Sequence, residues 1–257
     1  MSVLAQMQPI GLDDMKAVRL MNRVDQKYMA SADQLEPLLD RIADGYYVQH
    51  IDGEALAPYR TLYFDTDDLT MYTMHHNQKL NRQKLRVRTY RSTDTTFFEI
   101  KNKDNKRKTR KVRIPIEAAK FDHVAEIPEV CDFVDKNTPY TFIPHLSPLT
   151  LHPCLENSFK RITLVDKAMS ERVTIDSDIR FHNRATGNDS DISRLLVIEV
   201  KHEVGAPMSA IERALHEMHI LPRRMSKYCI GTALTNPSVK HNRFKPKLLF
   251  IDKIDRL

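Results

Sequence analysis

The chain has 257 residues, of which 41% are hydrophobic and 29% are charged; this composition provides for a sizeable core and argues against wholesale disorder. Six Gly against 13 Pro exclude a collagen-like or Gly-rich linker chain. The formal net charge of +6 favours a polyanionic partner, that is, nucleic acid, an anionic membrane or phosphate compounds.

Cysteine usage and hydropathy favour a cytoplasmic chain. Cys131, Cys154 and Cys229 lie far apart without metal-ligand spacing, which favours reduced thiols over a disulfide framework or a zinc ribbon. No apolar run approaches the length of a membrane span. Residues 1–10 lack the basic and apolar regions of a secretion signal. We therefore expect a cytoplasmic location.

The N-terminal half is predicted to alternate helices with strands. Apolar residues three or four apart predict helices at 12–21, 32–42 and 69–75, the second of which follows an N-capping Ser31. Pro115 has no backbone N–H to donate, so it favours a sheet edge for the strand that contains it. Alternation of polar and apolar residues predicts strands at 22–29, 46–51, 59–65, 84–90, 96–102 and 110–116.

The C-terminal half is predicted to contain further strands and one clear helix, at 209–218. Residues 117–158 are expected to be helical and irregular, and 182–194 to form a loop. Residues 236–257 are expected to form a basic tail, either a flexible arm or a contact to an anionic partner. We expect a single domain over 1–257, because no linker interrupts the chain. Strands are predicted at 159–167, 171–181 and 195–203.

Several predicted strands carry charge on one face only. In the strand at 84–90, Lys84, Arg86 and Arg88 share one face, while Leu85 and Val87 share the other. For a single strand, the ordinary interpretation is a polar face in water. Like charges about 5 Å apart on one sheet face repel by roughly 3 kcal/mol at an effective dielectric near 20. The same alternation recurs at Glu99 and Lys101, at Lys111 and Arg113, and at Glu199 and Lys201.

Repetition over several strands favours charged faces that converge on an anion. A closed eight-stranded antiparallel tunnel with a polar, basic lumen and helices packed on its outside meets this requirement, so an α+β fold is predicted. Arg suits bidentate contacts to phosphate, and Lys supplies point charges. Carboxylates beside a polyphosphate would be unfavourable unless a hard cation bridges them.

The motifs, in their order, resemble a known family. They are Arg23-x-Asp25-x-Lys27-Tyr28, Tyr59 to Asp65, Leu85 to Arg88, Glu99-Ile100-Lys101, Arg161, Arg172 to Asp176, Ile198 to Lys201 and Ser226-Lys227-Tyr228. This order is similar to the catalytic domain of the vacuolar transporter chaperone (VTC) family, the polyphosphate polymerase branch of the CYTH-like triphosphate tunnel metalloenzymes. The resemblance covers about residues 12–232.

The resemblance implies an eight-stranded tunnel and a polymerase that transfers the γ-phosphoryl group of ATP to polyphosphate, with Mn²⁺ or Mg²⁺. It implies metal ligation by Glu199 and, in addition, by Glu99. Catalytic roles are implied for Arg86, Arg88, Lys101, Glu199 and Lys227. Phosphate binding is implied for Lys27, Arg60, Arg86, Arg88, Lys101, Arg161, Arg172, Lys201 and Lys227. ATP, triphosphate and polyphosphate are the expected partners, and membrane association is expected only through a separate membrane protein.

Three alternatives remain open from the sequence. If water replaces the acceptor, the same site is a triphosphatase, and without turnover it is a polyphosphate-binding module. A nucleic-acid binder would use the basic run at 103–113, but aromatic residues are only 7% and Trp is absent. We therefore expect no sequence-specific nucleic acid as a partner.

Asp176 and Asp178 are expected to share a face, where they either assist a metal or balance nearby Arg.

Overall fold

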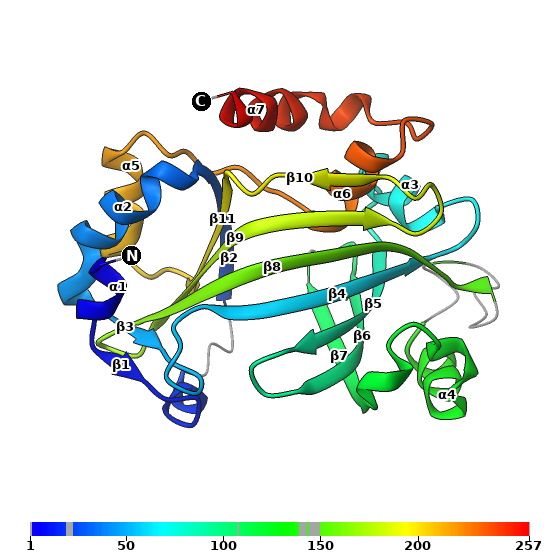
Figure 1. Cartoon of the computed structure of the whole chain (residues 1–257), viewed down its shortest axis with the longest axis horizontal. Coiled ribbons are helices and arrows are strands. Elements are labelled where there is room, and N and C mark those ends of the chain that lie inside the picture. Colours follow the sequence, from blue (N-terminus) through cyan, green and yellow to red (C-terminus); the bar gives the residue numbers. More distant parts are fainter. Residues whose placement is uncertain (1, 19–22, 107, 139–142, 144–149, 257) are drawn as a thin grey trace.

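The computed structural model describes residues 2–18, 23–106, 108–138, 143 and 150–256 (Figure 1). Eleven strands form one largely antiparallel sheet, whose hydrogen-bonded path runs β2-β11-β9-β8-β4-β5-β6-β7. These strands are β2 (Arg23–Ser31), β11 (Leu195–Glu203), β9 (Glu171–Asn183), β8 (His152–Asp166), β4 (Ala57–Asp65), β5 (Arg82–Tyr90), β6 (Thr95–Lys103) and β7 (Thr109–Ile116). Short strands off this path are β1 (Pro9–Ile10), β3 (Tyr46–Gln49) and β10 (Asp189–Asp191).

The sheet bends round without closing. In Figure 1, β4, β8 and β9 run across the view, whereas β2 and β11 on one side and β5 to β7 on the other run steeply to them. Within the described residues no ladder joins β2 to β7, so the predicted closed eight-stranded tunnel is corrected to an open, curled sheet. The outer edge of β2 instead pairs with residues 222–223: Tyr28 bridges to Pro222, and Arg223 N donates to the Lys27 carbonyl over 2.7 Å. At the other end, β7 contains Pro115 and is an edge strand, as predicted.

Helices pack against both faces of the sheet. They are α1 (Ser2–Gln6), α2 (Leu35–Ile42), α3 (Thr70–His76), α4 (Pro128–Asn137), α5 (Ala210–Glu217), α6 (Lys227–Thr235) and α7 (Lys245–Asp255). Of these, α2, α5 and α4 cover one face, whereas α6 and α7 cover one end of the other. Turns of 3-10 helix are η1 (Asp14–Ala17), η2 (Ala32–Gln34), η3 (Ala43–Gly45), η4 (Ala118–Lys120), η5 (Val124–Glu126) and η7 (Asn242–Phe244). The helix predicted at 12–21 is only the turn η1, and residues 19–21 lie outside the described residues.

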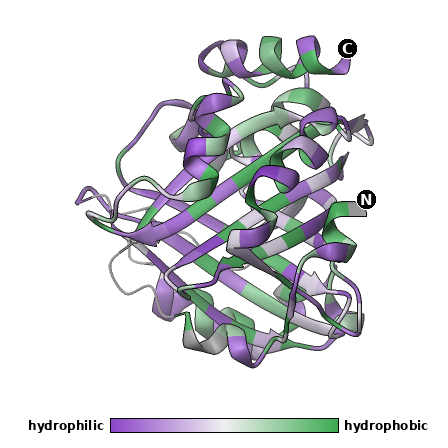
Figure 2. Cartoon of the chain, turned by 90° about the vertical axis from the view of Figure 1, so that its left-hand side faces the viewer, coloured by the Kyte–Doolittle hydropathy of each residue, from purple (hydrophilic) through white to green (hydrophobic). Residues whose placement is uncertain are grey.

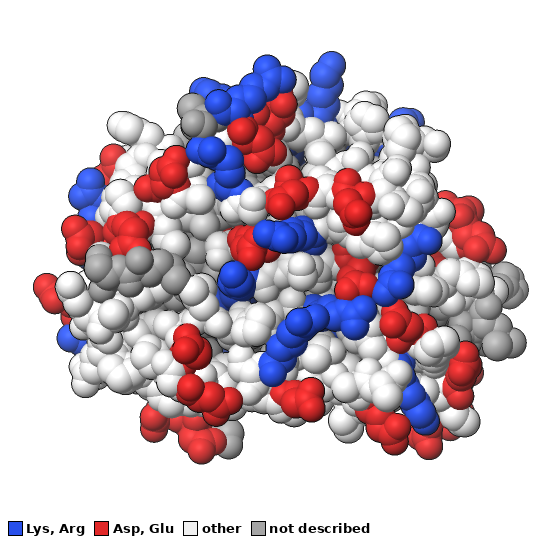
Figure 3. Space-filling view, viewed as in Figure 1, with Lys and Arg blue, Asp and Glu red and all other residues white. Residues whose placement is uncertain are grey.

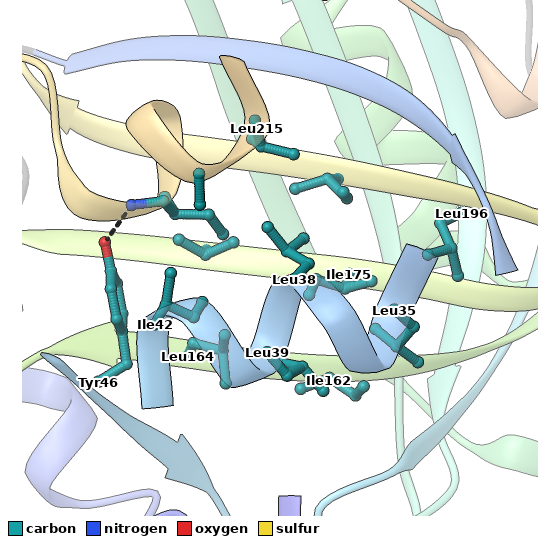
Figure 4. Close-up of a cluster of buried hydrophobic side chains, with 14 of the residues drawn as sticks. Leu35, Leu38, Leu39, Ile42, Tyr46, Ile162, Leu164, Ile175, Leu196 and Leu215 are labelled. Carbon is teal, nitrogen blue, oxygen red and sulfur yellow. Dashed lines mark hydrogen bonds between the residues drawn. The ribbon is translucent and has the colours of Figure 1, made fainter. Parts of the chain in front are cut away.

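One apolar cluster lies between α2, α5 and the sheet (Figure 4). Leu38 and Leu39 of α2 are fully buried and pack with Ile162 of β8 and Ile175 of β9. α5 begins at a capping box, in which Ser209 N donates to the Glu212 side chain over 3.0 Å and Glu212 N donates to Ser209 Oγ over 3.4 Å. These caps satisfy backbone donors that the helix itself leaves unpaired.

A second cluster fixes the outer face of β4, β5 and β6. Leu62, Leu85, Val87 and Phe98 are fully buried and pack with α4, which contributes Val134. Hydrophilic and hydrophobic residues therefore alternate along the strands, as Figure 2 shows. The apolar positions predicted from this alternation do face the helices, which leaves the charged positions on the opposite face.

The C-terminal segment is an ordered helix rather than a loose tail. In the third apolar cluster, α7 buries Ile251 and Ile254 against Leu195 and Val197 of β11, and Phe244 is buried before them. Two further boundaries differ from the prediction: β8 begins at His152, and the predicted loop at 182–194 contains β10. No helix of the described residues is long and apolar enough to cross a membrane.

We predict that Gly231→Ala lowers the free energy of unfolding by about 1–3 kcal/mol, the usual cost of overpacking. Gly231 lies in α6, where an added Cβ would lie 2.7 Å from Leu155 Cδ2 and from Phe181 Cε1. Urea unfolding measures the change. Gly45→Ala is the matched control, because a Cβ at Gly45 meets no atom within 4 Å. Equal stability of the two variants would contradict the predicted close packing of α6.

Candidate functional site

Strand pairing brings the charged positions onto one face of the sheet, here called the inner face. Arg86 of β5 lies opposite Glu99 of β6, and Glu199 of β11 lies opposite Lys27 of β2. By the same registers, the charged residues of the inner face include Asp25, Lys27, Arg82, Lys84, Arg86, Arg88, Glu99, Lys101, Lys111, Arg113, Arg161, Arg172, Asp176, Glu199 and Lys201.

The sheet curls around its inner face, and we call this concave side the hollow; charges on distant strands interact across it. Lys101 of β6 is solvent-exposed, yet its pKa is lowered from 10.5 to about 8. The main cause is the loss of bulk water around its ammonium group to the protein atoms on either side of the curl, although much of the side chain stays exposed, and the charge of Lys84 adds to this effect. Lys27 lowers this pKa and Glu199 raises it, although both residues lie at the other end of the strand path from Lys101. The curled sheet therefore encloses these charges from two sides.

Glu99 is a buried carboxylate held by two cations. Arg86 Nη2 lies 2.6 Å and Lys111 Nζ 3.1 Å from its oxygens, and the Glu99 side chain is 1% exposed. Burial alone would raise the pKa of Glu99, but the charges of Arg86, Arg88 and Lys111 outweigh it and lower this pKa to about 2. Glu99 is therefore ionised over the whole physiological range and orients Arg86.

Glu199 is held in the same way on the facing strands. Lys201 Nζ lies 2.5 Å from one of its oxygens, and Lys27 Nζ contacts the other. Burial opposes ionisation here too, but Lys27 and Lys201 lower the pKa of Glu199 far below its ordinary range. Both lysine side chains are thereby directed into the hollow.

Asp176 binds two further cations and connects the sheet to α6. Arg161 Nε lies 2.5 Å from Asp176 Oδ1 and Arg161 Nη2 2.8 Å from Oδ2, while Lys227 Nζ contacts Oδ2. Burial lowers the pKa of Lys227 to about 8; Asp176 opposes this shift and Arg161 adds to it. Asp176 thus balances nearby cations, one of the two roles considered from the sequence.

The position of Lys227 is set by its neighbour Tyr228, which faces the protein interior. Tyr228 Oη donates to Asp65 Oδ2, and Asp65 also accepts from the backbone N–H groups of Met71 and Tyr72 over 2.8 and 2.9 Å. Asp65 and Tyr228 are buried. This arrangement anchors the first turn of α6 to the first turn of α3, with Lys227 directed to the hollow.

Several cations of the hollow have no carboxylate partner. Among the described residues, Lys84, Arg88 and Lys101 form no ion pair; Lys84 Nζ donates to Ser226 Oγ over 2.7 Å and Arg88 Nε to Thr61 Oγ1 over 3.2 Å. Burial lowers the pKa of Lys84 and of Arg88, and neighbouring Arg86 lowers both further. On the face shown in Figure 3, by contrast, Lys and Arg side chains are interspersed with Asp and Glu. The unpaired cations make the hollow suited to an anion.

Aromatic rings line part of the hollow, which the sequence reasoning did not place in the site. Tyr59 and Phe159 stack with ring centroids 5.0 Å apart. The Arg161 guanidinium lies 5.0 Å from the Tyr59 ring, and Lys227 Nζ lies 4.4 Å from the Phe159 ring. Strand parity could have identified Tyr59, because it shares a face with Thr61, but the pairing of β4 with β5 was needed to orient that face.

Two predicted phosphate-binding residues differ from the others, Arg60 in the face it occupies and Arg172 in its partner. Arg60 is on the outer face with Leu62; its guanidinium forms a bidentate pair with Glu156, at 2.5 and 3.1 Å, and lies 4.1 Å from the Phe121 ring. Arg172 is on the inner face by register, and its Nη2 donates to the Met15 carbonyl over 3.1 Å. The structure brings the remaining predicted residues together in the hollow, namely Lys27, Arg86, Arg88, Lys101, Arg161, Lys201 and Lys227.

The side chains alone do not form a metal site. No three His, Cys, Asp or Glu residues of the described chain come together as metal ligands. Glu99 and Glu199, the predicted ligands, are each bonded to two cations. Asp178 does not share the face of Asp176, because it lies within a register shift of the β8–β9 pairing; it pairs instead with Lys160 and Arg180, at 3.3 and 3.0 Å. A hard divalent cation fits here only if phosphate oxygens supply most of its ligands.

The protein is an α+β domain, in which helices pack on a curled antiparallel sheet whose inner face is lined with cations. The sequence model of the VTC domain matches residues 22–236, and the chain belongs to this family. No curated protein matches the chain.

The chain also resembles solved structures, at low sequence identity. The chain is similar to putative adenylate cyclases from Bacillus halodurans and from Hippeastrum. The first has a TM-score of 0.50 at 15% identity, with 80% of this chain and 94% of that chain covered. The second, described as having a dominant triphosphatase activity, has a TM-score of 0.48 at 12% identity and covers 84% and 97%.

We predict that Lys101→Met stabilises the protein at pH 7. The folded state lowers the pKa of Lys101 from 10.5 to about 8, so between these values the unfolded chain binds more protons and wild-type stability rises with pH. Below pH 8 the folded protein holds a charge that its surroundings disfavour, and Met removes it. Urea unfolding at pH 7 and 10 measures the difference, which should shrink at pH 10. A Lys101→Met variant less stable than the wild type at pH 7 would refute the lowered pKa of Lys101 in the folded state.

Proposed function

We propose that the protein is a polyphosphate polymerase, which transfers the γ-phosphoryl group of ATP to a polyphosphate chain held in the hollow, with Mn²⁺ or Mg²⁺. The observation that carries this proposal is the set of unpaired cations, Lys84, Arg88 and Lys101, beside the cations fixed by Glu99, Asp176 and Glu199. Membership of the VTC family supports the choice of substrate.

Phosphoryl transfer mainly requires positioning and stabilisation of charge. Arg86, fixed by Glu99, offers a planar guanidinium that suits two phosphate oxygens at once. Arg88 and Lys101 add charge without the competition of an internal carboxylate. The attacking group would be a terminal phosphate oxygen, which needs no strong base at neutral pH. In this proposal the protein acts by holding donor and acceptor in line.

Facing Arg86, Lys27 and Lys201 hold Glu199 in its ionised form. When phosphates enter, these two lysines can transfer their hydrogen bonds to phosphate oxygens, which frees carboxylate oxygens of Glu199. Glu199 is the residue that would then hold a divalent cation together with the phosphates, and such a cation would offset charge on the phosphate oxygens. The expected partners are ATP, triphosphate and polyphosphate, with a separate membrane protein if the product crosses a membrane.

We predict that incubation with ATP and Mn²⁺ yields internal phosphate signals in ³¹P NMR and a ladder on a polyphosphate gel. Arg86→Ala should reduce this product by about a hundredfold or more, because it removes a bidentate contact to the transferred group. Glu199→Gln should lower it mainly by weakening the dependence on Mn²⁺. Arg180→Ala is the matched control, since Arg180 is exposed and pairs with Asp178 and Asp191 outside the hollow.

Products other than a polyphosphate ladder would indicate a different function. Orthophosphate without a ladder, lost in Arg86→Ala, would replace the polymerase with a triphosphatase. Binding of triphosphate without turnover would leave a polyphosphate-binding module. Equal activity of Arg86→Ala and Arg180→Ala would remove the hollow from the mechanism altogether.

We also predict that triphosphate binding is accompanied by proton uptake near pH 8. Lys101 and Lys227 have pKa values of about 8, and a bound anion raises them. Calorimetry in buffers of different ionisation enthalpy measures the uptake, which should be small at pH 6, where both lysines are already charged. Lys101→Met is the control for protons taken up by the ligand itself, and unchanged uptake in this variant would contradict the role of Lys101.

A further inference from the structure

A row of cations runs along β5 and extends past Arg86 and Lys84 to the start of the strand. Arg82, Lys84, Arg86 and Arg88 occupy alternate positions of one strand and therefore share its inner face. Neighbouring members of such a row lie about 7 Å apart, and the whole row spans about 20 Å. Arg86 and Arg88 are the inner members, whereas Arg82 is the first residue of the strand.

The outer end of this row meets cations from two other elements. Lys84 of this row donates to Ser226 Oγ over 2.7 Å, two residues after Arg224. Lys247 Nζ of α7 lies 5.7 Å from the Phe244 ring, which itself lies 6.3 Å from the His75 ring. The charge of Arg224 also lowers the pKa of Arg82, after the main effect of burial. Burial also lowers the pKa of Lys247 of α7, and Arg223 and Arg224 contribute. The Arg223 guanidinium itself lies over the Phe250 ring, at 4.2 Å. Among the described residues, Arg82, Arg224 and Lys247 form no ion pair with a carboxylate.

His75, at the end of α3, lies among the same cations. Burial and the charges of Lys84, Arg82 and Lys247 lower the pKa of His75 to about 2. Its buried Nδ1 atom has no hydrogen-bond partner. A neutral ring with an unpartnered nitrogen, near cations that form no ion pair among the described residues, indicates a local excess of positive charge.

Part of this cluster lies outside the region that defines the family. The family match ends at residue 236, whereas Lys247 belongs to α7 (Lys245–Asp255). Figure 1 shows α7 passing over the same side of the molecule as α6. The cluster is therefore a combination of a family element, β5, with a C-terminal helix that the family match does not include.

We propose that Arg82, Lys84, Arg224 and Lys247 form a second phosphate subsite, which binds the units of a linear polyphosphate that extend beyond the hollow. A linear anion with charge on every unit matches a row of cations that continues from the hollow to α7. Lys84 connects the two subsites, because it neighbours Arg86 in the row and donates to Ser226 next to Lys227. This inference rests on the proposed function and specifies its substrate as a chain longer than triphosphate.

The test compares the affinity of the full chain for tripolyphosphate and for a long polyphosphate of defined length, by calorimetry at fixed salt. The double variant Arg224→Ala/Lys247→Ala should weaken binding of the long chain about tenfold, which is about 1.4 kcal/mol. Its affinity for tripolyphosphate should change less than twofold. Lys245→Ala/Lys253→Ala removes the same charge from exposed positions of α7 and is the matched control. Circular dichroism melting checks that both variants fold.

The outcomes separate this subsite from the proposed function. If the double variant weakens both ligands equally, or no more than the control does, the subsite is wrong, while loss of tripolyphosphate binding in Arg86→Ala would still support the hollow. If the wild type binds neither ligand, the proposed function fails as well. If single-stranded RNA binds as tightly as the long polyphosphate and is weakened equally by the double variant, the subsite is a general polyanion surface and the proposal is overturned.

Discussion

Repulsion between like charges on one face of a sheet is the constraint on which the rest of the structure depends. Lysines and arginines that neighbour one another across strands are tolerated because buried carboxylates are placed between them, each shared by two cations. Glu99, Asp176 and Glu199 have this arrangement on different strand pairs. Breaking a buried pair is more damaging than never having formed it, so these carboxylates fix where the cations point. The cations left over create the positive potential of the hollow.

The apolar outer layers make this charge distribution possible. Where α2, α4 and α5 bury the apolar positions of the strands, the alternate positions face inward. The helices also supply functional groups: α6 places Lys227 in the hollow while its next residue, Tyr228, is bonded inside the protein. Helix packing therefore both buries apolar residues and positions the charged residues of the hollow.

Alternation along a strand is a local property, and the sequence predicted it well. The strand at 195–203 has the predicted bounds, and the two faces of β5 are as expected, because Leu85 and Val87 are fully buried. Orientation relative to the neighbouring strand is not local. The family resemblance implies a phosphate contact for Arg60, whereas pairing of β4 with β5 puts it on the outer face with Leu62. The open edge of the sheet also could not be predicted, because residues 222–223, far along the chain, pair with β2 where the closing strand would lie.

The packing of α7 has a consequence for where the folded unit ends. Phe244, Ile251 and Ile254 are buried in the same cluster as β11, and Tyr72 Oη of α3 donates to the Lys240 carbonyl over 3.0 Å. Burying three such side chains contributes roughly 5–9 kcal/mol, which is comparable with the whole stability of a typical domain. A chain cut at residue 236, where the family match ends, would expose one side of β11 and leave α3 without this contact. The smallest stable form of this protein is therefore longer than the segment by which its family is recognised.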